Sequence, residues 1–225
     1  MASRRPPSGC CRSRQIAGAL LGVVFLLGLS GIGASAITFV LAGVILQSVA
    51  GAAVALALSL APDPWATQEI IDWLIGSLTD RSMEEVQIAA PFIAVGIVIL
   101  LMLQRSLTAL SIGEDGAKSL GVNLTVTQIM LAIGVGLATG ASVAVAGIIS
   151  FVGLIVPQIM RWAIGGEPGK LLFPSAICGA VLVVAADMLV RFSPAAAEVK
   201  LGVAMSALGG PFFLVMLMSM RRRMA

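Results

Sequence analysis

Long apolar runs constrain the fold of this chain more than any other feature of its sequence. A helix needs about 20 apolar residues to cross the roughly 30 Å of hydrocarbon in a bilayer. Five runs approach or exceed that length: Ala36–Leu60, Val86–Leu103, Leu124–Val145, Leu171–Val190 and Val203–Met220. Gly147–Ile164, with Pro157 near its end, is a sixth candidate, and Ile16–Ser30 is a shorter seventh. The sequence therefore predicts an all-α, polytopic transmembrane helix bundle with six or seven spans.

Composition excludes the alternative of a soluble domain. Charged residues make up 11% of the chain and hydrophobic residues 59%, whereas soluble domains carry roughly 25% charged residues. The chain has no histidine, which removes the commonest metal ligand and the commonest general base. Its three cysteines form no CxxC pair, and we expect no metal and no cofactor.

A nucleotide site is also excluded. The segment Gly165–Lys170 superficially resembles a phosphate loop, but Ile164 stands where the first glycine is required. Leu171 replaces the serine or threonine that would hold magnesium. The chain is therefore not predicted to be an enzyme or to hydrolyse ATP itself.

Positive charges between the runs predict the orientation of the spans. The positive-inside rule places Arg221–Arg223 in the cytoplasm. Alternating backward places the acidic segment Ala61–Glu85 outside and the segment 105–123 inside. Within the outer segment, residues 63–79 are expected to form an interfacial helix that begins at Pro64.

The N-terminus conflicts with this orientation. Seven spans would place residues 1–15 outside, although they carry four arginines. Three readings remain open: the first run does not span, the N-terminus is not that of an intact protein, or a signal peptide ends near Ala34–Ala36. We treat residues 1–15 as a basic leader, non-native or disordered, and residues 16–225 as the transmembrane domain.

One charged pair lies inside an apolar run. An ionised carboxylate within a span is costly, and Arg191 follows Asp187 by one helical turn. An ion pair between them is therefore expected near the outer end of this span. Arg191 either only neutralises Asp187 or also faces outward to meet an acidic partner.

Four motifs, in order, resemble those of FecCD/BtuC-type ABC importer permeases. The segment Leu110–Val122 (LSIGEDGAKSLGV) is similar to a cytoplasmic loop of that family, and Ala146–Arg161 (AGIISFVGLIVPQIMR) to a span. Leu41–Gly43 and the segment Ala196–Val203, followed by Gly209–Phe213, match two further motifs. The match departs from the family at Gln158, at Glu167–Gly169 and at Lys200.

The resemblance implies the function of the chain. It would be the membrane-spanning permease subunit of a binding-protein-dependent importer for ferric siderophores in the bacterial inner membrane. Haem or cobalamin is the other expected cargo. The implied partners are a second permease subunit (identical or different), two ATPase subunits and a periplasmic substrate-binding protein. Family members usually have ten spans, and the aligned part begins near the fourth, so a truncated, non-transporting relic or a structural membrane protein is the alternative.

The resemblance also assigns roles to individual residues. Five fall in the loop that docks on the ATPase: Gly113, Glu114, Ala117, Leu120 and Gly121. Three align with a cytoplasmic gate: Ser35, Ala36 and Ile37. Arg191 and Glu198 fall where the family meets its binding protein.

Overall fold

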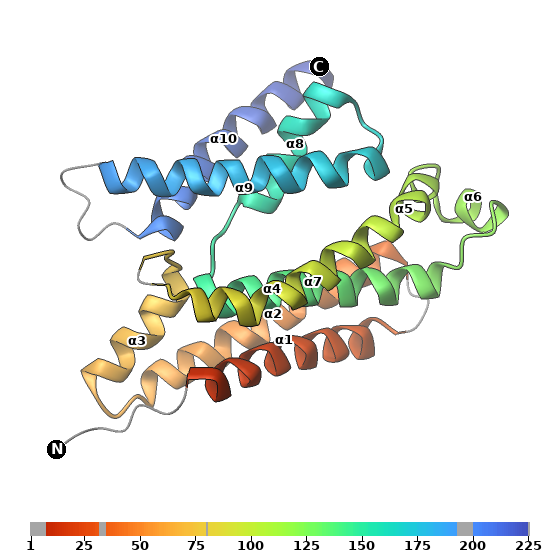
Figure 1. The fold of residues 1–225 in the computed structure, drawn as a ribbon. Helices are drawn as coiled ribbons and strands as arrows, with labels where there is room; N and C mark the ends of the chain where they lie inside the picture. Colours follow the sequence, from red (N-terminus) through yellow and green to blue (C-terminus); the bar gives the residue numbers. More distant parts are fainter. Residues whose placement is uncertain (1–7, 32–34, 80, 193–199, 225) are drawn as a thin grey trace. The chain divides into compact units, whose positions relative to one another are not determined.

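The computed structural model describes residues 8–31, 35–79, 81–192 and 200–224, and all regular secondary structure in these ranges is helical (Figure 1). The helices are α1 (Ser8–Ser30), α2 (Ala36–Ser59), α3 (Pro64–Ile75), α4 (Met83–Met102), α5 (Gln104–Leu110), α6 (Glu114–Ser119), α7 (Leu124–Ala146), α8 (Val152–Ile164), α9 (Pro168–Phe192) and α10 (Leu201–Met224). They belong to two compact units. The N-terminal unit comprises the chain up to Ile70 and Arg81–Val145, and the C-terminal unit comprises Ile71–Asp80 and Ala146–Ala225.

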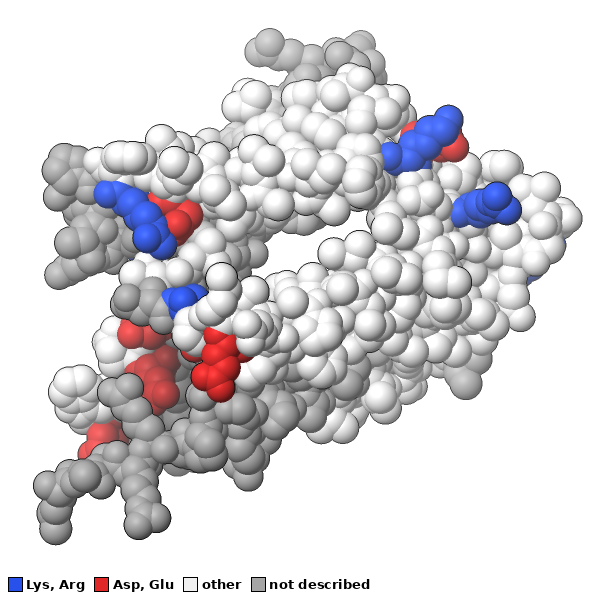
Figure 2. Space-filling view, viewed as in Figure 1, with Lys and Arg blue, Asp and Glu red and all other residues white. Residues whose placement is uncertain are grey.

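The prediction of an all-α membrane protein is confirmed. Four of the described helices are long and apolar enough to cross a bilayer: Ile37–Ser59, Met83–Met102, Leu124–Ala146 and Pro168–Phe192. Three shorter apolar helical stretches accompany them: Leu21–Ser30, Val152–Ile164 and Leu201–Met216. On the face shown in Figure 2, the charged side chains gather toward the ends of the helices, and the described surface between them is uncharged. A surface of this kind suits a hydrocarbon environment.

Two element boundaries differ from the sequence prediction. The run Gly147–Ile164 is helical only from Val152, because Gly147 (φ +73°) and Phe151 (φ +68°) adopt left-handed backbone that a helix cannot contain. The 13 residues of α8 cover about 20 Å, less than the hydrocarbon thickness. At the other end of the chain, α1 already begins at Ser8, so residues 8–15 of the predicted leader are helical. Residues 1–7 lie outside the described ranges.

Glycines on α7 let other helices of the N-terminal unit approach it closely. A Cβ atom on Gly96 of α4 would lie 2.7 Å from the carbonyl oxygen of Gly134 and 2.8 Å from the amide nitrogen of Ala138. Gly140 lies directly against Ala19 of α1 in the same way. Small residues at such contacts are typical of helix packing in membranes, where dispersion contacts rather than hydrophobic burial favour association.

The C-terminal unit packs α8, α9 and α10 against one another. Its buried centre consists of Ala186 on α9 and of Leu201 and Met205 on α10. The half-buried side chains around this centre are Leu78, Ile149, Val152, Leu182 and Val183. Because Leu78 is among them, the segment that follows α3 is part of this packing.

Candidate functional site

The short helix α6 is preceded and followed by glycines with positive φ angles, and backbone hydrogen bonds cap its C-terminus. The residue before it, Gly113, has a φ of +104°, and its carbonyl oxygen accepts a 3.0 Å hydrogen bond from the amide of Ala117. After the helix, Val122 N donates to Ala117 O at 3.0 Å and Gly121 N donates to Lys118 O at 2.9 Å. This pair of bonds, with Gly121 at a φ of +81°, is a Schellman motif. Glycine is therefore favoured at both positions that flank α6, because each has a positive φ angle.

Charges on α6 follow the helix dipole. Glu114 and Asp115 lie in its first turn and Lys118 in its last, which is the stabilising arrangement. Lys118 Nζ lies 3.4 Å from Asp115 Oδ1, and both side chains are largely exposed. Water screens this exposed pair, so it contributes little to the stability of α6.

Two large apolar side chains stand exposed on either side of α6. Ile112, just before the helix, is 70% exposed, and Leu120, just after it, is 65% exposed. Ala117 between them is fully buried and anchors α6 on the rest of the loop. Leu120 is among the predicted docking residues and Ile112 is not, although an isoleucine beside the polar and glycine residues of this loop could have indicated an exposed apolar position. We call Ile112, Leu120 and Gly121 the tip of the loop.

The predicted gate residues lie at the beginning of α2. Ser35 is its N-cap: the hydroxyl oxygen accepts a 3.3 Å hydrogen bond from the amide of Thr38 and lies 3.1 Å from the hydroxyl of Thr38. Ala36 is the first helical residue, and Ile37 is 74% exposed. The three residues thus form a capped helix start with one exposed apolar side chain.

The predicted outer ion pair lies in the last turns of α9. Arg191 Nε lies 2.7 Å from Asp187 Oδ2. The Asp187 side chain is 18% exposed and that of Arg191 is 57% exposed, so the guanidinium remains accessible while it neutralises the carboxylate. Glu198, the other predicted docking residue, lies outside the described residues.

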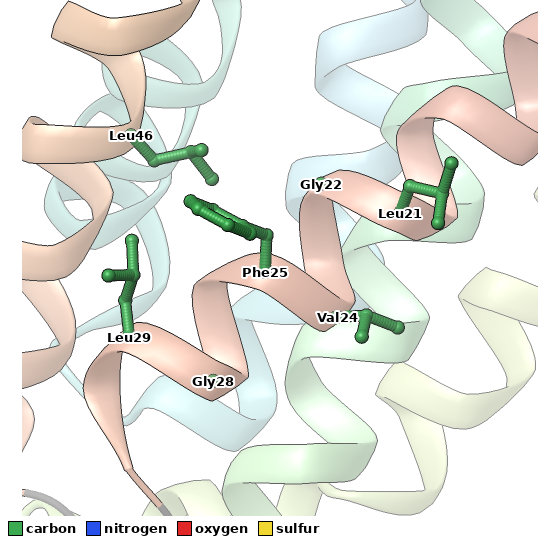
Figure 3. A pocket seen from close by; sticks show the side chains of 7 residues that line it. All are labelled: Leu21, Gly22, Val24, Phe25, Gly28, Leu29 and Leu46. Carbon is green, nitrogen blue, oxygen red and sulfur yellow. The ribbon is translucent and has the colours of Figure 1, made fainter.

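The N-terminal unit also contains an apolar pocket, between α1 and α2 (Figure 3). The ring of Phe25 extends toward Leu46 of α2, and Gly22 and Gly28 leave room on α1. Its remaining lining residues are Leu21, Val24 and Leu29. No ionisable side chain lines it, so the pocket offers apolar contact and no charged group that could orient a ligand.

Four described helices that are long and apolar enough to cross a bilayer, with charged side chains near helix ends, indicate a multi-pass membrane protein. The profile of the FecCD transport family matches residues 13–219, and the chain belongs to this family. The family resemblance drawn from the sequence motifs is therefore confirmed, as is the multi-pass placement in the cytoplasmic membrane.

Permease proteins of two bacteria are similar to this chain in sequence. The vitamin B12 import system permease protein BtuC of Vibrio cholerae is 39% identical over 178 residues, covering 79% of this chain and 53% of that protein. The uncharacterized ABC transporter permease protein YvrB of Bacillus subtilis is 36% identical over 203 residues, covering 90% of this chain and 57% of that protein. The chain therefore spans somewhat more than half the length of these two relatives.

A solved structure shares the fold. It is an ABC transporter assigned to the metal-chelate type, in an inward-facing conformation. The TM-score is 0.77 at 27% sequence identity, and the match covers 89% of this chain and 64% of that one. The likeness extends over nearly the whole of the chain.

Proposed function

We propose that this chain forms the membrane-spanning permease part of an ATP-driven, binding-protein-dependent importer. The observation that carries the proposal is the loop 105–123, in a member of the FecCD transport family. A Schellman motif ends its helix α6, and Ile112 and Leu120 on either side of this helix are exposed. These two aliphatic side chains lie in a polar loop between apolar helices, where contact with a protein partner would remove them from water. The proposed partner at the tip of the loop is an ATPase subunit.

The proposed complex contains a second permease subunit, two ATPase subunits and a periplasmic substrate-binding protein. The chain itself is the transport pathway and not an enzyme. In this arrangement Ser35, Ala36 and Ile37 lie at the cytoplasmic gate. The exposed Ile37 at the capped start of α2 supports this role, because an apolar side chain at a pathway mouth can exclude water.

The proposed orientation follows the charges. Loop 105–123 lies in the cytoplasm, and α3 lies at the outer membrane–water interface. None of the residues of α3 is buried, and Trp65 is 86% exposed. Indole side chains are enriched at that depth of a bilayer, which supports an interfacial position for this helix.

The proposed cargo is a metal chelate, with a ferric siderophore as the first candidate. One relative is named for vitamin B12 import, and the solved structure is of the metal-chelate type. The described residues contain no group of three or more acidic, histidine or cysteine side chains that could bind a bare metal ion. A pathway of this composition suits a bulky chelate, whose metal is already enclosed, better than a free cation.

Transport by the reconstituted protein tests the function. The chain would be placed in proteoliposomes with its cognate ATPase and binding protein, and uptake of a ferric siderophore, cobalamin and haem compared. We expect ATP-dependent uptake of one chelate and none when the ATPase cannot hydrolyse ATP. Failure to bind any ATPase, together with no uptake, would instead favour a non-transporting relic or a structural membrane protein.

We also propose that Arg191 meets an acidic side chain of the binding protein. The 57% exposure of its side chain supports this, since the guanidinium has donors left over beside Asp187. Exchanging the pair, Asp187→Arg with Arg191→Asp, retains the internal attraction but reverses the outward charge. We expect the exchanged chain to fold and to bind the binding protein about fivefold more weakly, a loss of about 1 kcal/mol.

The salt dependence of the affinity and a conservative variant serve as controls for the swap of Asp187 and Arg191. The loss should shrink as salt rises, because the Debye length falls to about 10 Å at 0.1 M. Arg191→Lys retains the charge and should lose less than the exchange does. Affinity is measured in nanodiscs at low and high salt. Equal affinities of wild type and exchanged chain at low salt would leave Arg191 with only the role of neutralising Asp187.

A further inference from the structure

Three stretches of the C-terminal unit meet backbone to backbone at the end of α3. Ser77 N donates to Ala146 O at 2.8 Å, and Ile148 N donates to Trp73 O at 3.4 Å. Gly202 N, in the first turn of α10, donates to Gly76 O at 3.2 Å. We call residues 72–77, 146–148 and 200–202 the outer joint. These hydrogen bonds connect the last turn of α3 with the chain after α7 and with the start of α10.

Glycines at the outer joint make the contact closer than side chains would permit. A Cβ atom on Gly147 would lie 2.6 Å from Trp73 O, and one on Gly76 would lie 2.8 Å from the carbonyl carbon of Ile148. A Cβ atom on Gly202 would meet the carbonyl group of Ile75. All three obstacles are backbone atoms, which cannot rotate aside. The segments of the outer joint are therefore in direct backbone contact, with no side chain between them at these three glycines.

The outer joint also supplies the cap of α10. The first four amides of a helix lack partners within the helix, and the amide of Gly202 finds its partner in Gly76 O. Lys200 immediately precedes the helix, and its carbonyl oxygen accepts from the amides of Val203 and Ala204. A cation at this position opposes the helix dipole, which favours negative charge there.

The carboxylate of Asp72 compensates for this unfavourable charge. Lys200 Nζ donates a hydrogen bond to Asp72 Oδ1, from a position 128 residues further along the chain. The Lys200 side chain is 28% exposed and that of Asp72 is 48% exposed, so the pair is only partly screened by water. Asp72 and Gly76 are one helical turn apart, and both contact the start of α10. The end of α3 thus provides both a charge and a hydrogen-bond acceptor to that helix.

We propose that the outer joint is a fixed joint, in which Asp72 and Lys200 position the start of α10 on the last turn of α3. During a transport cycle these two segments keep their contact and move together. Lys200 is a positioning residue in this arrangement and does not contact cargo. That the two segments move together during transport rests on the proposed function, whereas the stabilisation of the start of α10 by Asp72 and Lys200 does not.

Hydrogen exchange measures the capping directly, in the purified full chain. Asp72→Asn leaves Lys200 unneutralised at the helix start, and we expect exchange of the amides of residues 201–204 to accelerate about five- to tenfold. Glu69→Gln removes an acidic side chain from the same helix and should change nothing there. The charge-reversed double variant, Asp72→Lys with Lys200→Asp, restores the pair and places an aspartate before the helix. Slow hydrogen exchange of the amides of residues 201–204 should therefore return. The role of the pair would be overturned if hydrogen exchange in Asp72→Asn equalled that of the wild type, or if the double variant did not regain slow hydrogen exchange.

Cross-linking tests whether the joint stays closed during transport. In a chain whose three native cysteines are replaced by alanine, Asp72→Cys and Lys200→Cys would be joined by a short bis-methanethiosulfonate, and uptake by this variant would be compared before and after joining. We expect cargo uptake to persist after cross-linking, because a fixed joint loses no motion. Loss of uptake that a reductant reverses would show that the segments must separate, and the fixed joint would be wrong. Absence of uptake by the untreated wild type would contradict only the proposed function. The hydrogen-exchange measurement would still test whether Asp72 and Lys200 stabilise the start of α10.

Discussion

Replacing Gly121 by tryptophan is expected to abolish cargo-stimulated ATP hydrolysis while the chain still inserts into the membrane. Gly121 lies at the tip of the loop, and no atom lies within 4 Å of a Cβ placed on it. The indole would therefore project from the surface that we propose to seat in the ATPase. A side chain of this size cannot be accommodated in a packed interface without displacing the partner. ATP turnover of the reconstituted transporter, with and without loaded binding protein, is the measurement.

A smaller substitution separates bulk from backbone strain. The φ of Gly121 is +81°, and any other residue in this conformation costs about 1–3 kcal/mol. Gly121→Ala carries the same strain with one methyl group, and we expect it to retain most of the stimulation. Equal loss in both variants would point to the Schellman motif rather than to the docking surface. Full stimulation in Gly121→Trp would mean that the ATPase binds elsewhere.

The second large effect is expected from Gly96→Leu, which should destabilise the N-terminal unit. The atoms that a new side chain would meet belong to the backbone of α7, at 2.7 Å and 2.8 Å from the Cβ position. They cannot move aside unless α4 and α7 separate. We expect a loss of about 3 kcal/mol or more, at the upper end of overpacking effects. Thermal unfolding in detergent, followed by circular dichroism, measures it.

Gly51→Leu is a matched control for this substitution. Gly51 lies within α2 of the same unit, and no atom lies within 4 Å of its Cβ position. Both substitutions replace a helical glycine and gain about 0.5–1 kcal/mol of helix propensity. The difference between the two variants therefore isolates the packing at α7. Similar stabilities in the two variants would contradict the close contact of α4 with α7.

Features that depend on neighbouring residues could be predicted from the sequence. Apart from the start of α1, the apolar runs predict the long helices to within a few residues, because each run must satisfy its own backbone hydrogen bonds in lipid. Asp187 and Arg191 lie four residues apart, so a helix brings them together without any help from the rest of the fold. Gly113 and Gly121 flank α6 at the positions where positive φ angles are needed.

Other local features could not be predicted. Phe151 adopts a φ of +68°, which is rare for a phenylalanine. Helix α8 therefore begins only after Phe151 and is shorter than the helix predicted from the apolar run Gly147–Ile164. The ring of Phe151 packs against Phe213 with a centroid separation of 6.5 Å, and Gly209 lies against the same ring. These contacts with α10 accompany the unusual backbone angle. Apolar periodicity carries no information about them.

The sequence by itself determined the class of protein, the approximate positions of the apolar helices and the composition of the loop 105–123. Only the tertiary structure decided which segments meet: Gly96 with α7, and Asp72 with Lys200 across 128 residues. The physical reason is the range of the forces involved. Hydrocarbon burial and helical hydrogen bonds act within one segment and leave a pattern in its composition. Contacts between distant segments depend on close packing of particular backbone and side-chain atoms, which appears only when the helices are assembled.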